Sequence, residues 1–141
     1  MAFTGNYSCN TLRTSLMTGG INFSTDSFKL ALYTNSATLD ENTTTYTAVG
    51  EASGGNYVAT GQAVTATLSY SSTATGSIAY VTFSAPSWTG SITARGALIY
   101  KVGGSSPAIC VLDFGNDKIS SSTFTVSMPA DTSTSALIRL S

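Results

Sequence analysis

The chain has 141 residues, enough for one domain with its own core, but only 9% of them are charged and the formal net charge at pH 7 is −1. None is histidine, which excludes Ser-His-Asp and Cys-His catalytic arrangements and argues against the usual catalytic zinc sites. The six basic residues are spread along the chain with no two adjacent, which argues against a nucleic-acid partner because phosphate binding needs clustered Lys and Arg.

The opening residues lack the basic and apolar regions of a secretory signal, so the protein is expected not to be secreted. The only two cysteines, Cys9 and Cys110, are then expected to be reduced thiols rather than a disulfide. No apolar run approaches the length of a membrane span, so no membrane partner is expected.

Residues 1–24 are predicted to form an N-terminal arm with a short helix that belongs to the same unit as the rest of the chain. Asn10 is a candidate cap for a helix over 11–18, and one of the two glycines that follow can end it in a left-handed conformation. Leu12 and Leu16 are four residues apart and share one face. Because so short a helix does not persist alone, it is expected to dock on its own domain or on a neighbouring subunit.

Residues 25–141 are predicted to form a β-sandwich domain, because apolar residues alternate with polar ones from residue 28 onward. Alternation predicts strands over 28–33, 64–68 and 78–83, with a turn region rich in Ser and Thr over 70–76.

Between the first two of these strands lies a polar stretch, 34–61, whose only charges are Asp40, Glu41 and Glu51. It is unusually long for a connection without regular structure, so it is predicted to be a functional loop or to hold short elements. Asp40 followed by Glu41 could start one helical turn.

The second half of the chain predicts five further strands. They cover residues 91–94, 97–100, 108–112, 124–128 and 136–140. The second and third are continuous apolar runs, which predicts central strands covered on both faces and joined by a hairpin loop over 103–107. Trp88 is expected in a loop before these strands, and Asp113 and Asp117 are expected to flank a turn after them, with an ion pair to Lys118.

No helical pattern alternates with the strands, which argues against a parallel α/β sheet. The predicted fold is therefore all-β: an antiparallel β-sandwich, jelly-roll-like, of about eight strands with a short N-terminal helix. An immunoglobulin-like strand order stays open, because sequence does not determine the order of strands in a sheet.

No catalytic, cofactor-binding or metal-binding residue is predicted. Carboxylates are the most plausible remaining acid–base groups. An enzyme that used carboxylates alone would need Asp40, Glu41 and Glu51 to converge in one cleft.

Eight residues are instead candidate contacts with a partner protein. Trp88 is read as a core residue, as an interface anchor or as a platform for sugar stacking. Arg95 is expected to pair with Glu51 or Asp113, or with a neighbouring subunit. The eight candidates are Phe3, Tyr7, Leu12, Leu16, Tyr46, Tyr57, Trp88 and Arg95.

Five stretches spread over roughly residues 9–140 carry a family resemblance. They read FKLALYTNSATLDENTTTYT, EASGGNYVATG, TARGALIYK, AICVLDFGNDK and ALIRL. Together they resemble the capsid decoration, or cement, proteins of tailed bacteriophages. The resemblance implies a β-sandwich or jelly-roll module without enzymatic activity that sits on the outside of an icosahedral head and ties capsomers together.

The resemblance also implies partners and a location. The partners are the major capsid protein and copies of the chain itself, as a dimer or a trimer. The location is the capsid surface of the virion, after synthesis in the host cytoplasm. Residues 34–61 and the N-terminal segment would be among the surfaces that meet the shell. The alternative is a carbohydrate- or receptor-binding tail module, for which Trp88 and the seven tyrosines provide rings that could stack on sugars.

Overall fold

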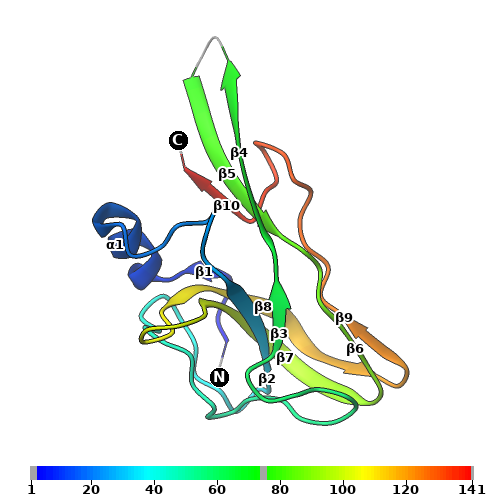
Figure 1. Ribbon diagram of the computed structural model, residues 1–141. Coiled ribbons are helices and arrows are strands. Elements are labelled where there is room, and N and C mark those ends of the chain that lie inside the picture. The colour runs from blue at the N-terminus through cyan, green and yellow to red at the C-terminus, as the bar shows by residue number, and fades with distance from the viewer. Residues whose placement is uncertain (1–2, 74–75, 141) are drawn as a thin grey trace.

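The computed structural model describes residues 3–73 and 76–140, and within them every pairing between strands is antiparallel (Figure 1). The prediction of an all-β protein with antiparallel sheets and a short N-terminal helix is confirmed. The elements are β1 (Tyr7–Ser8), α1 (Asn10–Thr18), β2 (Phe28–Tyr33), β3 (Gln62–Val64), β4 (Ala66–Thr73), β5 (Gly76–Phe83), β6 (Ser87–Thr89), β7 (Ile92–Lys101), β8 (Ala108–Ser120), β9 (Thr123–Thr125) and β10 (Ile138–Leu140).

The strands form a five-stranded sheet of order β1-β8-β7-β2-β3, a three-stranded sheet of order β10-β5-β4 and a β6-β9 pair. The chain passes from the first sheet to the second at Thr65, between β3 and β4. In Figure 1 the β4–β5 hairpin projects away from α1 and the five-stranded sheet.

The larger core contains residues from all three sheets. Strand β2 has the bounds that the alternation of apolar residues predicts. Phe28, Leu30 and Leu32 point from one face of β2 into this core. The rings of Phe28 and Phe83 lie 5.6 Å apart, edge to face, and therefore connect β2 with β5.

A second core covers the opposite face of the five-stranded sheet. Ala31 and Tyr33 of β2 face it, and the N-terminal arm and the loop after β2 supply its cover through Phe3 and Leu39. A Cβ atom at Gly96 would overlap the ring of Phe3, so this glycine makes room for the arm. The loop 34–61 thus covers a sheet face; it has turns and isolated bridges, and the helical turn predicted at Asp40 does not form.

Helix α1 has nearly the predicted bounds but a different start. Asn10 is its first residue, not its cap; Cys9 is the N-cap and makes no side-chain capping bond. The Asn10 backbone N–H donates to Glu41 O (2.8 Å), which ties the helix to the long loop. Gly19, with φ 78°, ends the helix as predicted. Leu12 is buried and Leu16 is not, although both were expected on one docked face.

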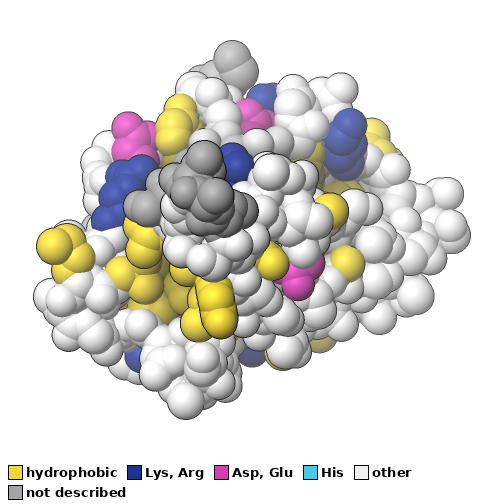
Figure 2. Space-filling model, turned by 90° about the horizontal axis from the view of Figure 1, so that it is seen from above, with side chains coloured by type: hydrophobic (Ala, Val, Ile, Leu, Met, Phe, Trp, Pro, Cys, Tyr) yellow, Lys and Arg dark blue, Asp and Glu magenta, His cyan; other side chains and the backbone are white. Residues whose placement is uncertain are grey.

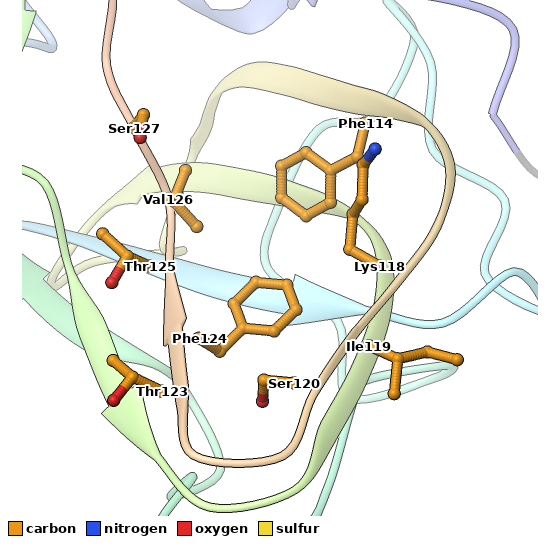
Figure 3. A pocket seen from close by; sticks show the side chains of 9 residues that line it. All are labelled: Phe114, Lys118, Ile119, Ser120, Thr123, Phe124, Thr125, Val126 and Ser127. Carbon is orange, nitrogen blue, oxygen red and sulfur yellow. The ribbon is translucent and has the colours of Figure 1, made fainter.

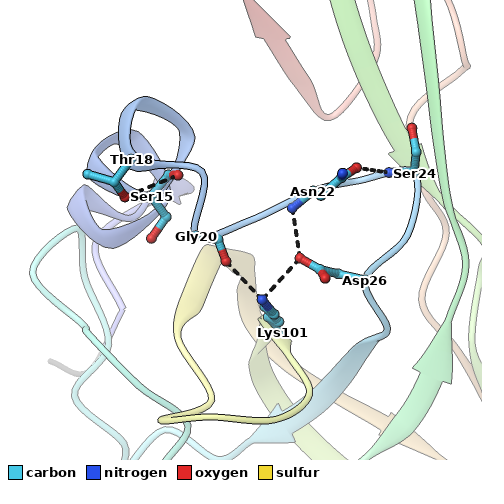
Figure 4. Close-up of polar contacts among 7 residues, drawn as sticks. All are labelled: Ser15, Thr18, Gly20, Asn22, Ser24, Asp26 and Lys101. Atoms are coloured by element: carbon cyan, nitrogen blue, oxygen red, sulfur yellow. Dashed lines mark hydrogen bonds and ion pairs between the residues drawn. The ribbon is translucent and has the colours of Figure 1, made fainter.

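The connection from α1 to β2 is anchored on the end of β7 (Figure 4). Lys101 Nζ donates to Gly20 O (2.8 Å) and lies 3.2 Å from Asp26 Oδ2. The Asn22 backbone N–H also donates to Asp26 Oδ2 (2.7 Å), and this bond, with the Lys101 contact, lowers the pKa of Asp26. The anchor ties the segment after α1 to the five-stranded sheet.

Several strand boundaries differ from the prediction. Segments 91–94 and 97–100 belong to one strand, β7. Its pairing with β8 is interrupted by a register shift at Arg95 and continues from Gly96 onward. The turn predicted at Asp113 and Asp117 is wrong, since β8 runs through both residues. Gly115 takes a φ of 85° there, so the strand absorbs an irregularity and does not reverse. The predicted turn region 70–76 is largely strand, and residues 74–75 lie outside the described residues.

The end of the chain and Trp88 also differ from the prediction. Trp88 lies in β6, not in a loop. The strand predicted over 124–128 begins one residue earlier and ends at Thr125, as β9, and the strand predicted over 136–140 shortens to β10. No helix among the described residues is long and apolar enough to cross a membrane.

Candidate binding surface

The structure buries three of the eight predicted contact residues in the protein's own core. Phe3 lies in the second core, and Leu12 and Trp88 lie in the larger one. The Trp88 ring packs 5.4 Å from that of Tyr57. A partner docked on this fold does not reach these three side chains, so they stabilise the domain itself.

Arg95 is paired within the chain. Its Nε lies 3.0 Å from Asp113 Oδ1, and each of the two side chains is 11% exposed. The hydrogen bond from Arg95 lowers the pKa of Asp113. The predicted pair with Asp113 is confirmed; the pair predicted between Asp113 or Asp117 and Lys118 is not among the ion pairs of the described residues.

Tyr46 and Tyr57 are half-buried and hold the carboxylate of Glu51 between them. The Tyr46 hydroxyl donates to Oε2 (2.7 Å) and the Tyr57 hydroxyl to Oε1 (2.6 Å). Oε1 also accepts the Thr60 backbone N–H (2.8 Å). Glu51 is therefore a latch that closes the long loop on itself, and its acceptor capacity is largely taken up by the protein.

Two tyrosines of the sheet complete this latch. Tyr33 of β2 donates to Thr47 O and Tyr100 of β7 donates to Thr60 O, each at 2.6 Å. The rings of Tyr46 and Tyr100 lie 4.9 Å apart. Burial, and then the nearby charge of Glu51, raise the pKa of Tyr33 well above its usual value.

The remaining loop carboxylates do not join Glu51 through hydrogen bonds. Asp40 Oδ1 accepts the Asn42 backbone N–H (2.8 Å) in a local turn. Within residues 3–73 and 76–140, no group of three or more His, Cys, Asp or Glu side chains could hold a metal ion. The Asp40 and Glu51 carboxylates thus bond to other groups of the loop itself.

The two cysteines are free, as expected, and lie on opposite faces of the five-stranded sheet. Burial raises the pKa of the Cys9 thiol to about 11, and burial also raises that of Cys110. We expect neither thiol to react with a thiol-specific reagent in the native protein at neutral pH, because the thiolate is the reactive form. Both should react once the protein is unfolded; labelling of the native protein at the unfolded rate would contradict this expectation.

One open hollow of about 390 Å³ lies between β8 and β9 (Figure 3). Phe114 and Phe124 face it, with ring centroids 6.2 Å apart. The hydroxyl of Ser120 is occupied, since it donates to Gly90 O (2.7 Å) and accepts the Ile92 N–H (3.2 Å). A second hollow of about 530 Å³ lies between β1 and β10 and includes Tyr7, a predicted contact residue.

An apolar groove of about 300 Å³ lies between α1 and one face of the three-stranded sheet. Its floor follows from the strand register, which aligns side chains in rows across the three strands. One row is Leu68, Val81 and Ile138; the next is Ala79 and Leu140, and Tyr70 of β4 continues this second row outside the groove's lining. The floor continues the larger core outward, because Val81 is buried whereas Leu68 is 50% and Leu140 64% exposed.

The other wall of this groove comes from the N-terminal segment. Leu16 of α1 lines it with Ile21 and Phe23 from the connection to β2. No charged residue is among its described lining, and Figure 2 shows hydrophobic side chains gathered around a hollow beside the projecting hairpin. The groove therefore presents exposed apolar side chains to solvent.

Leu16 is the predicted contact residue that belongs to this groove, whereas Leu68 and Leu140 were expected only as alternating strand residues. The alternation of apolar and polar residues around Leu68 and Leu140 could have predicted that both lie on an apolar sheet face. Sequence could not reveal that the face extends past the core, because that depends on the cover that other segments supply.

Comparisons of the chain with protein-family models, with curated proteins and with solved structures gave no match.

Proposed function

We propose that the protein is a non-enzymatic virion structural protein that binds the outside of a phage capsid and cements capsomers together. Its partners are the major capsid protein and copies of itself, and its location is the capsid surface. The scaffold we propose is a β-sandwich of jelly-roll type, since the larger core lies among three antiparallel sheets.

The observation that carries the proposal is the uncharged apolar groove between α1 and the three-stranded sheet. An apolar segment of the capsid protein seated there buries Leu16, Leu68 and Leu140. Because only 9% of the residues are charged, docking removes water from few charged groups and the desolvation free energy is small. Many such contacts, repeated over a lattice, give strong attachment without a deep pocket.

The alternative is a carbohydrate- or receptor-binding tail module, motivated by Trp88 and the seven tyrosines, of which Tyr70 is exposed. Trp88 is buried against Tyr57. A sugar ring could not stack on it without opening the core.

The test uses phage heads assembled without this chain, to which purified protein is added. We expect the protein to bind the heads and to increase their resistance to heat. Leu140→Asp should weaken binding about a hundredfold, because it places a carboxylate in an apolar contact. Co-sedimentation measures binding, and thermal release of DNA measures stabilisation.

The matched control is Ile119→Asp. Ile119 is 75% exposed, close to the 64% of Leu140, but it lies on β8 outside the groove. The Ile119→Asp variant should bind heads as tightly as the unchanged protein does. Failure of the unchanged protein to bind heads, or equal binding by Leu140→Asp, would contradict the proposal.

A further inference from the structure

Strand β4, at the edge of the projecting hairpin, is the longest strand that ends a sheet in the described residues. β4 has eight residues and lies at the end of the three-stranded sheet. The other terminal strands are short: β1 has two residues, and β3 and β10 have three each. Short edges resist pairing with another chain, whereas a long edge invites it.

β4 also lacks the residues that usually protect an edge. It reads ATLSYSST, without a charge or a proline, and β5 has none either. Proteins that stay monomeric commonly place Lys or Pro on such an edge. Tyr70, in the middle of β4, is 79% exposed.

The hairpin has little support of its own. β10 pairs with β5 only over Ala79–Val81, and beyond this the described sheet consists of β4 and β5 (Figure 1). A two-stranded hairpin is marginal in water unless further strands or a packed face support it. An added strand at β4 provides that support.

The hydrogen-bonding pattern of β4 leaves every second residue of the strand available for such pairing. Ser84 N donates to Thr65 O (2.9 Å), where the β4–β5 pairing begins. Backbone bonding to one neighbour alternates along an antiparallel strand, so the odd-numbered residues bond toward β5. Leu68, Tyr70 and Ser72 therefore direct their N–H and C=O groups to the open edge.

We propose that two copies of this chain pair antiparallel through their β4 edges, around a two-fold axis at Ser69. Leu68 of each copy then lies opposite Tyr70 of the other, as a pair that exchanges backbone hydrogen bonds. The two apolar floors join into one face of a six-stranded sheet. The proposal deepens the proposed function by naming where copies meet, and it does not require a capsid.

A second copy is the occupant that the edge itself favours. The pairing brings no like charges together, because β4 has no charge. Aliphatic and aromatic side chains face each other across the axis, which is a favourable cross-strand pair. A two-fold arrangement also closes with two copies, so no open-ended fibre forms.

The first measurement is the mass in solution by sedimentation, without capsids. We expect twice the 14.5 kDa of the chain. Tyr70→Asp should raise the dissociation constant about a hundredfold, since it places a carboxylate on the joined apolar face of both copies. Ile119→Asp should stay dimeric, because Ile119 is 75% exposed, close to the 79% of Tyr70, but is distant from β4 in sequence. Circular dichroism verifies that each variant is folded.

The second measurement tests the register. In a non-hydrogen-bonded antiparallel pair the Cα atoms lie about 4.5 Å apart, within the range of a disulfide. Ser69→Cys should therefore form a disulfide between two copies under mild oxidation. Thr67→Cys should not, because residue 67 lies opposite residue 71 of the other copy. The native cysteines are buried and do not interfere.

A monomer or a trimer in solution would overturn the proposal, as would a dimer in which Ser69→Cys does not cross-link preferentially. A dimer with the expected cross-link that fails to bind heads would leave this inference standing and contradict the capsid function instead.

Discussion

Replacing Glu51 by alanine is expected to lower the free energy of unfolding by about 3 kcal/mol. The change removes the acceptor of the Tyr46 and Tyr57 hydroxyls and of the Thr60 N–H, all of them short bonds to a charged group. Partly buried donors left without an acceptor account for most of the loss. Denaturant unfolding measures it, and the melting temperature should fall by about 10 °C.

Glu41→Ala is the matched control, because it makes the same substitution in the same loop. Glu41 contributes its backbone oxygen to Asn10, and alanine keeps that bond. Its effect should stay within about 0.5 kcal/mol. Glu51→Gln should lie between the two, since an amide still offers one acceptor oxygen. Equal stability of Glu51→Ala and Glu41→Ala would show that the latch contributes nothing.

Alkaline pH is expected to destabilise the protein steeply above pH 10, the ordinary pKa of tyrosine. Burial raises the pKa of Tyr33, Tyr46, Tyr57 and Tyr100 in the folded protein, and Glu51 adds to each shift. The unfolded chain ionises these groups near pH 10 while the folded protein keeps them protonated. Their contribution to stability is therefore complete below pH 10 and is lost as the pH rises above it.

The size of this effect follows from the buried tyrosines. Each can contribute up to about 1.4 kcal/mol per pH unit, and Tyr46 contributes less because solvent reaches it. Tyr33 and Tyr57 alone predict a loss of about 2 kcal/mol over the first pH unit above 10. Urea unfolding on both sides of pH 10 measures the slope. Tyr57→Phe removes one of the ionising groups, so its slope must be shallower; a pH-independent stability of the unchanged protein would contradict the expectation.

Alternation in the sequence predicts the parts of this fold where local pattern and packing agree. β2 forms at the predicted residues because Phe28, Leu30 and Leu32 belong to one core. The hairpin loop 103–107 and the end of α1 at Gly19 also follow from local turn chemistry. These features depend on neighbours in sequence, which is why the sequence reveals them.

The mistaken boundaries depend on contacts between distant segments. Pairing with β8 merges two predicted strands into β7 despite the irregularity at Arg95. The strand continues through Asp113 because that residue is paired with Arg95 and Gly115 absorbs the irregularity. A turn composition is thus overridden by a long antiparallel partner.

The binding surface could be predicted only in fragments. Leu16 was a candidate contact, but its neighbours in the groove, Leu68 and Leu140, are 52 and 124 positions away in the chain. The Glu51 latch was split in the same way: Tyr46 and Tyr57 were expected at an interface and Glu51 in an acidic loop. Only the fold brings these polar groups together.

The two ends of the described chain have different surroundings. Phe3 packs against the five-stranded sheet, whereas Leu140 belongs to the apolar groove beside the three-stranded sheet. The ends are therefore not equivalent as attachment points. We expect a fluorescent protein or an affinity tag fused on the N-terminal side of Phe3 to leave the groove open. The same fusion on the C-terminal side of Leu140 should obstruct the groove, because Leu140 lines it.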